Sequence, residues 1–364
     1  MYNTSIQSWE EKRKYTGNYR WPERDVRRYV YEISPNIKFN DLWNLLFADD
    51  AAFVTTDENK LQILVTLFHE ITSAFGLTIS IKKSEILVQT NEQNLKDQEK
   101  IKSEYQQATK RKQPKKSSIE INQEKLNDVY NFKYIGGMMN KCGNLIDELQ
   151  RRKNLALVQY RKLRTTIFKS KHIDVEAKVR LFNLLVLTKL LFECNNWKLT
   201  KGQLKSLESF HFLRLREIMG KTYKDKITTE EVFIATNSEK IEYQISMRRL
   251  KMLAKFERMD SKLIPKIVMY GTIDKHKLTG MDSDRIRKFK NIYMKELEKD
   301  LALFGLTKDE WREEAKVAKK WNNDIRKKKK ELNEKWINDL TKQTTVRREN
   351  RRRLLVEQQS EQSE

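Results

Sequence analysis

The stretch LLFADDAAFV, from Leu45 to Val54, places two adjacent aspartates between two apolar runs. These runs predict two short strands joined by a tight turn at Asp49 and Asp50. Adjacent carboxylates repel each other, and an aspartate pair in a turn is often no more than a favourable turn sequence. A divalent cation is the alternative explanation, because two-metal phosphoryl transfer uses carboxylates that bridge ions about 4 Å apart. A third carboxylate must then come from another strand.

A helix and further strands are predicted directly after this hairpin. Asp57 is suited to a helix N-cap, apolar residues recur at helical spacing from 61 to 75, and Gly76 ends the helix. Residues 77–81 alternate between apolar and polar side chains, which is typical of a strand, and residues 85–89 indicate another. These elements predict an α+β region with a small antiparallel sheet and a helix, and the apolar flanks of the aspartate pair indicate a buried hairpin.

The rest of the chain shows mainly helical periodicity. Residues 90–117 form a polar insert, either a loop or an exposed helix, and Val129–Gly137 reads as a strand that ends in a glycine pair. Thr200 and Gln203 predict a capping box at the start of a helix. The fold class is therefore α+β in the N-terminal third and predominantly α overall. The predicted regions are a leader without assignment (1–40), the α+β region (41–137), two helical regions (138–222 and 223–325) and a basic low-complexity tail (326–364).

Composition restricts the partners. The chain of 364 residues carries 74 Lys and Arg against 51 Asp and Glu, a formal net charge of +23, which favours a nucleic-acid partner. No membrane partner is expected, because the most apolar run, Leu181–Phe192, is too short to span a bilayer and no amphipathic anchor or lipidation signal is found. Two cysteines without a CxxC pattern, Cys142 and Cys194, indicate a reducing intracellular compartment and no zinc site. The basic tail is also compatible with a nuclear import signal.

Several stretches occur in an order that resembles one protein family. LLFADDAAFVT and the following LQILVTLFHEITSAFGLTISIKKSEILV resemble the palm of non-LTR retrotransposon (LINE-type) reverse transcriptases. Phe47–Asp50 is similar to that family's aromatic-x-Asp-Asp motif, and Leu191–Trp197 is similar to a thumb motif that usually has Tyr-Gly where this chain has Phe192 and Glu193. The other matching segments are Gly76-Leu77, Lys82–Glu85 beside the incoming triphosphate, the primer-grip turn Phe132–Gly137, the helix Arg248–Met259, and Asp300–Gly305 with Ala315 and Trp321.

The resemblance covers roughly residues 41–326 and implies the C-terminal half of a palm (41–137), a thumb (138–222) and a post-thumb region (223–325). The family's first catalytic aspartate and a Gln-Gly motif lie upstream of the Asp pair, with the fingers further upstream. Residues 1–40 contain no Gln-Gly, and Asp25 is their sole aspartate. We therefore expect the two-metal site to be incomplete in this chain.

The resemblance implies catalytic roles for Asp49, Asp50 and Lys83 (or Lys82 beside it), with Mg²⁺ or Mn²⁺ held by the two aspartates only in a competent enzyme. A solvated lysine beside a strand is the plainer interpretation of Lys83. Nucleic-acid contacts are predicted for the turn glycines Gly136 and Gly137, for the basic thumb residues Arg151, Arg152, Lys153, Arg161, Lys162 and Arg164, and for Tyr160 as a stacking side chain. The alternatives are a plain turn and a solvated basic helix face. His211 is expected to have no ligand role, and Trp197, Trp311 and Trp321 to be core residues.

These residues lead to three hypotheses. The first is a truncated LINE-type reverse transcriptase fragment that binds RNA or an RNA–DNA duplex and polymerises DNA only if another chain supplies the missing palm half and fingers. The second is a repurposed structural RNA-binding subunit of a ribonucleoprotein particle. The third is a non-functional remnant of a decayed element.

Overall fold

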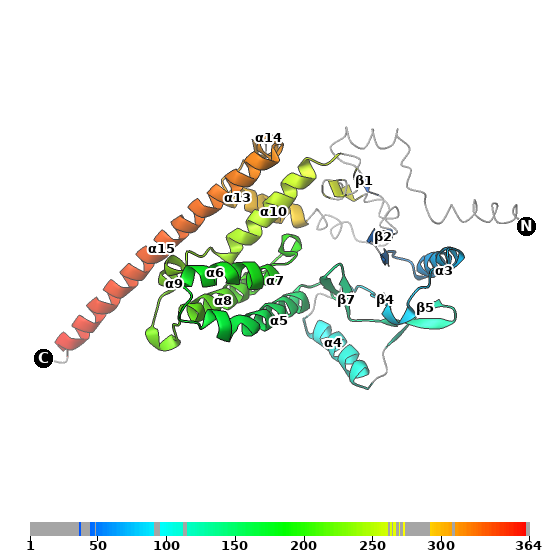
Figure 1. Ribbon diagram of the computed structural model, residues 1–364, viewed down its shortest axis with the longest axis horizontal. Coiled ribbons are helices and arrows are strands. Elements are labelled where there is room, and N and C mark those ends of the chain that lie inside the picture. Colours follow the sequence, from blue (N-terminus) through cyan, green and yellow to red (C-terminus); the bar gives the residue numbers. More distant parts are fainter. Residues whose placement is uncertain are drawn as a thin grey trace, which may run out of the picture. The chain divides into compact units, whose positions relative to one another are not determined.

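Helices dominate the chain and the strands are short (Figure 1), which confirms the expectation of a predominantly α protein. The chain divides into two compact units, one formed by 1–148 with 260–291 and the other by 149–259 with 292–364. The leader predicted for 1–40 lies outside the described residues except for 36–37. The computed structural model describes residues 36–37, 44–47, 49–90, 95–111, 115–260, 263, 265–266, 269, 272–273, 292–307 and 310–361.

Among its described residues, the first unit contains several small sheets and two long helices. Its elements are β1 (Asn36–Ile37), β2 (Asn44–Phe47), β3 (Asp50–Phe53), α3 (Glu58–Ala74), the 3₁₀ turn η2 (Ile81–Lys83), β4 (Glu85–Ile86), α4 (Leu95–Lys110), β5 (Lys116–Ile121), β6 (Glu124–Asp128), β7 (Asn131–Tyr134), β8 (Gly137–Asn140) and β9 (Thr272–Ile273). The pairs β2–β3 and β7–β8 are antiparallel, and β1 pairs with β9 in parallel. Separate small sheets thus replace the single antiparallel sheet that the sequence predicts.

The largest sheet has the order β4–β6–β5 and carries α3 on one face. β6 runs parallel to β4 and antiparallel to β5. Val65 of α3 packs with the buried sheet residues Ile119, Ile121 and Leu126. The side-chain amide of Gln62 bonds to both backbone groups of Glu120, at 2.9 Å each, and so fixes the helix on strand β5.

The ends of α3 form as predicted, but the strand expected after it does not. The Asp57 carboxylate accepts the backbone N–H of Lys60 at 3.1 Å, and Gly76 ends the helix with φ +73°. Residues 77–80 are irregular, and the 3₁₀ turn η2 follows. Ile79 and Ile81 nevertheless pack against the core below α3. The alternation of apolar and polar residues therefore indicates that every second side chain is buried, and an irregular segment can bury its side chains in the same alternating way.

The polar insert contains the helix α4, and polar contacts attach it to the strands. Tyr105 donates to the Asp128 carboxylate at 2.5 Å, and Lys141 approaches both groups, at 2.9 and 3.3 Å. Lys102 pairs with Asp147 at the start of the next helix. Of the two alternatives for this insert, a loop or an exposed helix, the structure therefore has the helix.

All regular elements described in the second unit are helical. Its elements are α5 (Ile146–Leu163, in this unit from Leu149 on), the π-helical turn η3 (Arg164–Phe168), α6 (Val175–Phe182), the π-helical turn η4 (Asn183–Leu187), α7 (Thr188–Leu190), the 3₁₀ turns η5 (Cys194–Asn196) and η6 (Tyr223–Asp225), α8 (Lys201–Ile218), α9 (Thr229–Ala235), α10 (Ile241–Glu257), α13 (Ile292–Leu303), α14 (Glu310–Ala315) and α15 (Ala318–Glu361). The predicted capping box is present, since Thr200 and Gln203 each accept the other's backbone N–H.

Aromatic rings contributed by five helical elements form the centre of this unit. The ring of Tyr160 stacks on Phe168 at 4.7 Å between centroids, and Phe182 lies edge-on to both. His211 stacks on Phe182 at 5.8 Å and meets Phe233 edge-on. Trp197, Trp311 and Trp321 are also buried, which confirms that they are core residues.

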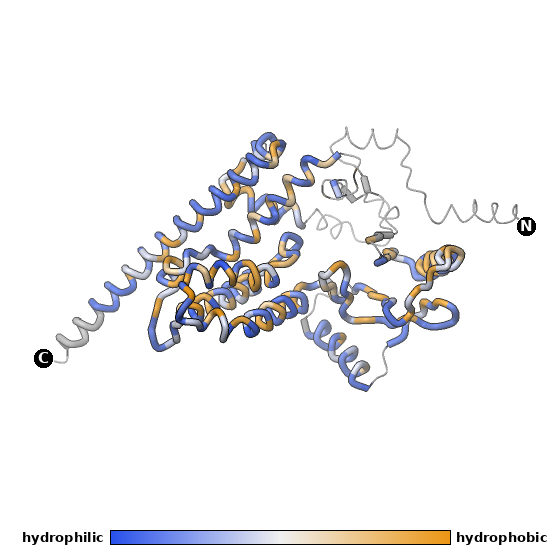
Figure 2. Tube along the Cα trace, in the orientation of Figure 1, coloured by the Kyte–Doolittle hydropathy of each residue, from blue (hydrophilic) through white to orange (hydrophobic). Residues whose placement is uncertain are grey.

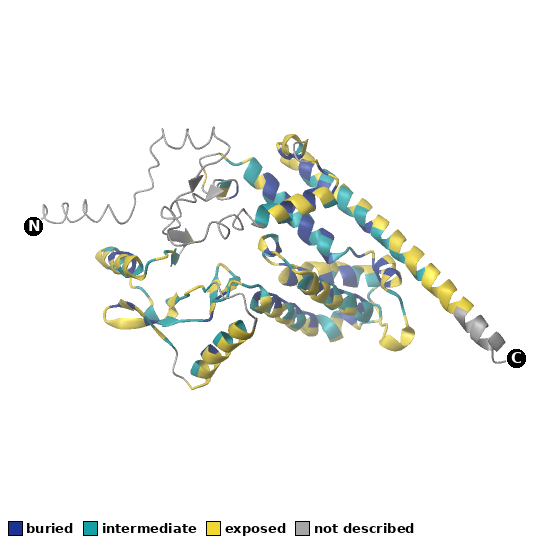
Figure 3. Ribbon diagram, turned by 180° about the vertical axis from the view of Figure 1, so that it is seen from behind, coloured by how far each residue is buried: buried dark blue, intermediate teal, exposed yellow. Residues whose placement is uncertain are grey.

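Of the tail predicted for 326–364, the described residues 326–361 belong to the long helix α15. This helix begins at Ala318 and crosses position 326 without a break. Trp321, Ile325 and Asn333 are buried on it, and the Asn333 side chain accepts the backbone N–H of Lys240 at 2.9 Å and donates to the Ser238 carbonyl at 3.2 Å. Its later turns are exposed and mainly hydrophilic (Figures 2 and 3).

Candidate nucleic-acid interface

The aspartate pair lies at the tip of the β2–β3 hairpin. The register pairs Phe47 with Asp50, so Asp49 lies in the turn and Asp50 begins β3. Both aspartates are exposed, and Phe47 is exposed beside them. The tip of the hairpin is therefore exposed, contrary to the expectation of burial, and solvent reduces the repulsion between the two carboxylates.

The described donors at this tip are fewer than a two-ion site requires. Within the described residues, no three or more His, Cys, Asp or Glu side chains gather where they could hold a metal ion. Asp49 and Asp50 thus supply two exposed carboxylates, and binding of Mg²⁺ or Mn²⁺ remains a prediction that depends on further ligands.

Lys83 is exposed at the end of η2, with Lys82 exposed next to it. The backbone N–H groups of Lys83 and Ser84 both donate to the Ser80 carbonyl at 3.0 Å, which fixes this turn. The structure holds the backbone of Lys83 in place and leaves its ammonium group in solvent. A contact of Lys83 with a nucleotide triphosphate remains a prediction.

Gly136 and Gly137 have different roles in the β7–β8 hairpin. Tyr134 pairs with Gly137, which leaves Ile135 and Gly136 as the two central turn residues. Both have positive φ, +47° and +85°, as a type I′ turn requires. Gly136 adopts such a φ without strain, whereas a β-branched isoleucine there is a conformational outlier. The strain at the tip of this hairpin therefore lies at Ile135.

Replacing Ile135 with asparagine should raise the free energy of unfolding by about 1 kcal/mol, because Asn-Gly is a preferred type I′ pair and Ile135 is strained. Little burial is lost, since Ile135 is 42% exposed. Urea unfolding of both proteins measures the change. Ile63→Asn is the matched control: Ile63 is 46% exposed on helix α3, and there the substitution should be neutral or destabilising. Equal effects at both positions would contradict strain at Ile135.

Two of the predicted nucleic-acid contacts on α5 are buried. Tyr160 is 0% exposed within the aromatic core, so the prediction that it stacks on a base or sugar is wrong. Arg152 is 5% exposed; its guanidinium lies 4.4 Å above the Phe192 ring and 3.9 Å from the Glu193 carboxylate. The prediction that Arg152 follows a phosphate backbone is wrong for the same reason.

The other basic residues of this segment differ in accessibility. Lys153 donates to the Ser206 hydroxyl at 3.1 Å, and Arg164 donates to Glu217 at 2.5 Å; these contacts join α5 and η3 to α8. Arg151 is half-buried. Arg161 and Lys162 are exposed in the last turn of α5. They are the members of the predicted set best placed to meet a phosphate.

Three of the stretches that resemble the reverse transcriptase family converge on a buried ion pair. Arg249 of α10 bonds to Asp300 of α13 through two nitrogens, at 2.6 and 2.8 Å, and donates to the Trp197 carbonyl at 3.0 Å. Ser246 donates to Asp300 at 2.6 Å. Burial alone would lower the pKa of Arg249, but the hydrogen bonds and charge of Asp300 hold that pKa above its usual value. The sequence motifs contain Trp197, Arg249 and Asp300, but only the structure shows that they form one structural junction, which Ser246 joins.

Glu193 lies beside this junction with an unusual backbone conformation. Its φ of +60° is left-handed, at the position where the resembled thumb motif usually has glycine. The side chain faces Arg152. The structure thus accommodates a glutamate in a conformation that favours glycine.

Searches of protein-family models, curated proteins and solved structures give no match to this chain. None of the described helices combines the length and the apolar character needed to cross a membrane. The assignment of function therefore depends on the sequence motifs and on the surfaces that the structure exposes.

Proposed function

We propose that this chain is a LINE-type reverse transcriptase fragment that binds RNA or an RNA–DNA duplex. DNA synthesis on an RNA template, with Mg²⁺ or Mn²⁺ at Asp49 and Asp50, would occur only when another chain supplies the missing palm half. The order of the sequence motifs supports the ancestry. The binding function rests on one observation, the exposed basic surface of the later turns of α15.

Every side chain from 345 to 353 on α15 is exposed, and this segment holds five arginines and one glutamate. Arg348 pairs with Glu231 at 3.4 Å, but both side chains are well exposed, so this pair contributes little. Exposed cations on a helix neutralise phosphates and release counterions, which favours binding to nucleic acid of any sequence. Arg161 and Lys162 of α5 provide a second exposed basic site.

Neutralising Arg351, Arg352 and Arg353 with glutamine should weaken binding to an RNA–DNA hybrid and flatten its salt dependence. The slope of log K against log salt should fall by roughly 1 for each phosphate contact that is lost. Fluorescence anisotropy between low and physiological salt measures both quantities. The control neutralises three exposed lysines of the first unit, Lys60, Lys100 and Lys110, and should change the slope by less. An unchanged slope in the arginine variant would show that these α15 arginines do not contact the nucleic acid. A wild-type protein that does not bind the hybrid would refute the binding function.

Primer extension on an RNA template tests the polymerase part of the proposal. The purified chain should give no product with Mg²⁺ or Mn²⁺, and a complementing palm chain should restore synthesis that Asp49→Ala and Asp50→Ala abolish. Extension by the chain alone, sensitive to Asp49→Ala, would show that no second chain is needed.

A structural subunit of a ribonucleoprotein particle is the second candidate. It is favoured by the internal contacts of Arg152, Tyr160 and Arg164, which make the second unit a helical body held together by its own core. For this role, Asp49→Ala should leave co-sedimentation with an RNA-containing particle unchanged. Arg161→Glu with Lys162→Glu should weaken it, and nuclease should abolish it. Reversal at Arg152 is not a suitable test, because burying a glutamate there would perturb the fold.

A further inference from the structure

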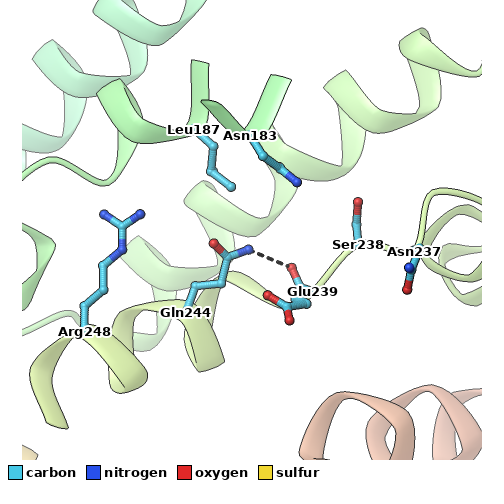
Figure 4. A pocket seen from close by; sticks show the side chains of 7 residues that line it. All are labelled: Asn183, Leu187, Asn237, Ser238, Glu239, Gln244 and Arg248. Atoms are coloured by element: carbon cyan, nitrogen blue, oxygen red, sulfur yellow. Dashed lines mark hydrogen bonds between the residues drawn. The ribbon is translucent and has the colours of Figure 1, made fainter. Parts of the chain in front are cut away.

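A pocket of about 380 Å³ lies in the second unit, where η4, the link between α9 and α10, and α10 meet (Figure 4). Asn183 and Gln244 reach toward it from opposite walls. Its volume is within the range of small-ligand sites, but its lining is mostly polar, unlike the apolar lining of most such sites. The lining residues are Asn183, Leu187, Asn237, Ser238, Glu239, Gln244 and Arg248.

The backbone around the pocket departs from regular helix on two sides. Asn183 and Leu187 are the first and last residues of the π-helical turn η4. Such turns inside α-helices occur frequently at functional sites. Asn237 follows α9 in a left-handed conformation, with φ +45°, and is exposed, so solvent reaches this wall.

The lining offers several hydrogen-bond donors. Arg248 uses one nitrogen to donate to the Leu191 carbonyl at 2.8 Å, and a guanidinium has five N–H donors in total. Gln244 donates to the Glu239 carbonyl at 3.3 Å, which holds its amide at the pocket wall (Figure 4). The side-chain amides of Asn183 and Asn237 add further N–H donors, and each also carries a carbonyl oxygen that can accept a hydrogen bond.

Positive charge is concentrated next to this lining. Lys251 follows Arg248 by one turn of α10, and Arg326 and Lys329 lie on α15, which packs against α10. Burial and the charges of Arg326, Lys329 and Arg248 together lower the pKa of Lys251. Glu239 balances one of these cations, since it pairs with Lys329 at 2.5 Å. Four cations and one carboxylate leave an excess of positive charge that an anion would compensate.

We propose that this pocket binds the phosphate group of a nucleotide, either a free mononucleotide or one residue of an RNA strand. A phosphate accepts several hydrogen bonds at once, and an arginine beside amide donors suits its oxygens. The adjoining cations favour its charge. This site is independent of the aspartate pair and of the arginines at 347–353 on α15.

Calorimetric titration of the full chain with AMP, adenosine and a short RNA at fixed ionic strength tests the proposal. The wild type should bind AMP and show at least about tenfold weaker binding to adenosine. Asn183→Asp introduces a carboxylate of nearly the same size into the pocket and should weaken AMP binding about tenfold or more, because like charges repel at close range. Asn154→Asp is the matched control: Asn154 is exposed on α5, and its side chain accepts a hydrogen bond from Gln150 that a carboxylate also accepts. It should leave AMP binding within about twofold.

A second variant keeps the proposal testable if Asn183→Asp fails to fold. Lys251→Gln with Arg326→Gln leaves the lining intact, lowers the nearby charge and should weaken AMP binding about fivefold. If the short RNA binds and loses affinity in these variants while AMP does not bind, the strand is the source of the phosphate. AMP and RNA binding that neither variant changes, or binding of neither ligand, would overturn the proposal. The α15 arginine variant should retain AMP binding, so failure of the pocket and failure of the α15 interface are separable.

Discussion

Replacing Asp300 with alanine should lower the free energy of unfolding by about 3–5 kcal/mol, because it leaves the buried Arg249 guanidinium without its counter-charge. Asp300 and Arg249 are 3% and 7% exposed, and the two side chains share two short hydrogen bonds. Ser246 loses its acceptor in the same variant. Chemical unfolding followed by circular dichroism measures the loss.

Two further variants separate the charge pair from simple loss of packing. Arg249→Met combined with Asp300→Leu removes both charges and should recover most of the stability, since apolar side chains of similar size can replace a buried ion pair. Glu176→Ala breaks the exposed pair of Glu176 with Arg180, both more than 70% exposed, and should cost about 0.5 kcal/mol or less. A loss of similar size for Asp300→Ala and Glu176→Ala would contradict the role of the junction.

His211 should make the second unit sensitive to acid. The side chain is fully buried between Phe182 and Phe233, and burial lowers its pKa from 6.5 to about 4. Within the described residues, neither ring nitrogen has a hydrogen-bond partner. Because the unfolded chain takes up the proton first, the stability contribution of His211 is complete above pH 6.5 and is lost as the pH falls toward 4. The loss should reach about 2 kcal/mol at pH 5 and about 3 kcal/mol at pH 4.

The measurement is the difference in unfolding free energy between wild type and His211→Phe from pH 7.5 to 5, which isolates this residue. Glu208 provides a control of opposite sign on the same helix. Burial raises the pKa of Glu208 to about 7, so its contribution is complete below pH 4.5 and is lost as the pH rises through 7. Glu208→Gln should therefore stabilise the protein at pH 7.5 and not at pH 5. A pH-independent difference for His211→Phe would refute the prediction.

Local features of the structure could be predicted from sequence because their causes are local. The cap by Asp57, the capping box of Thr200 and Gln203, and the end of α3 at Gly76 each depend on residues within one turn. Hydrogen bonds between near neighbours fix all of these features.

Features that depend on distant partners could not be predicted. Tyr160 lies in a basic helix whose composition suggests solvent, but Phe168 and Phe182 cover its ring. The low apolar content after residue 325 conceals the continuation of a helix whose first turns are anchored by the buried residues Trp321, Ile325 and Asn333. Burial at such positions is decided by elements far away in the sequence.

The candidate site divides in the same way. The residue types at Asp49, Asp50, Arg161 and Lys162 could be identified from sequence, and the structure leaves their side chains exposed. The pocket beside Arg248 could not, because η4 forms one of its walls and lies about fifty positions before the link that forms the next wall. The polar lining of the pocket forms only where η4 and α10 lie next to each other in the fold.

The left-handed position of Glu193 restricts the order in which this chain can change during evolution. One nucleotide separates glutamate codons from glycine codons, and glycine there would relieve about 1 kcal/mol of backbone strain. The same change would remove the carboxylate that faces the buried guanidinium of Arg152. Glycine at position 193 would therefore relieve backbone strain and at the same time remove a carboxylate that faces Arg152, so the two residues constrain each other's replacement.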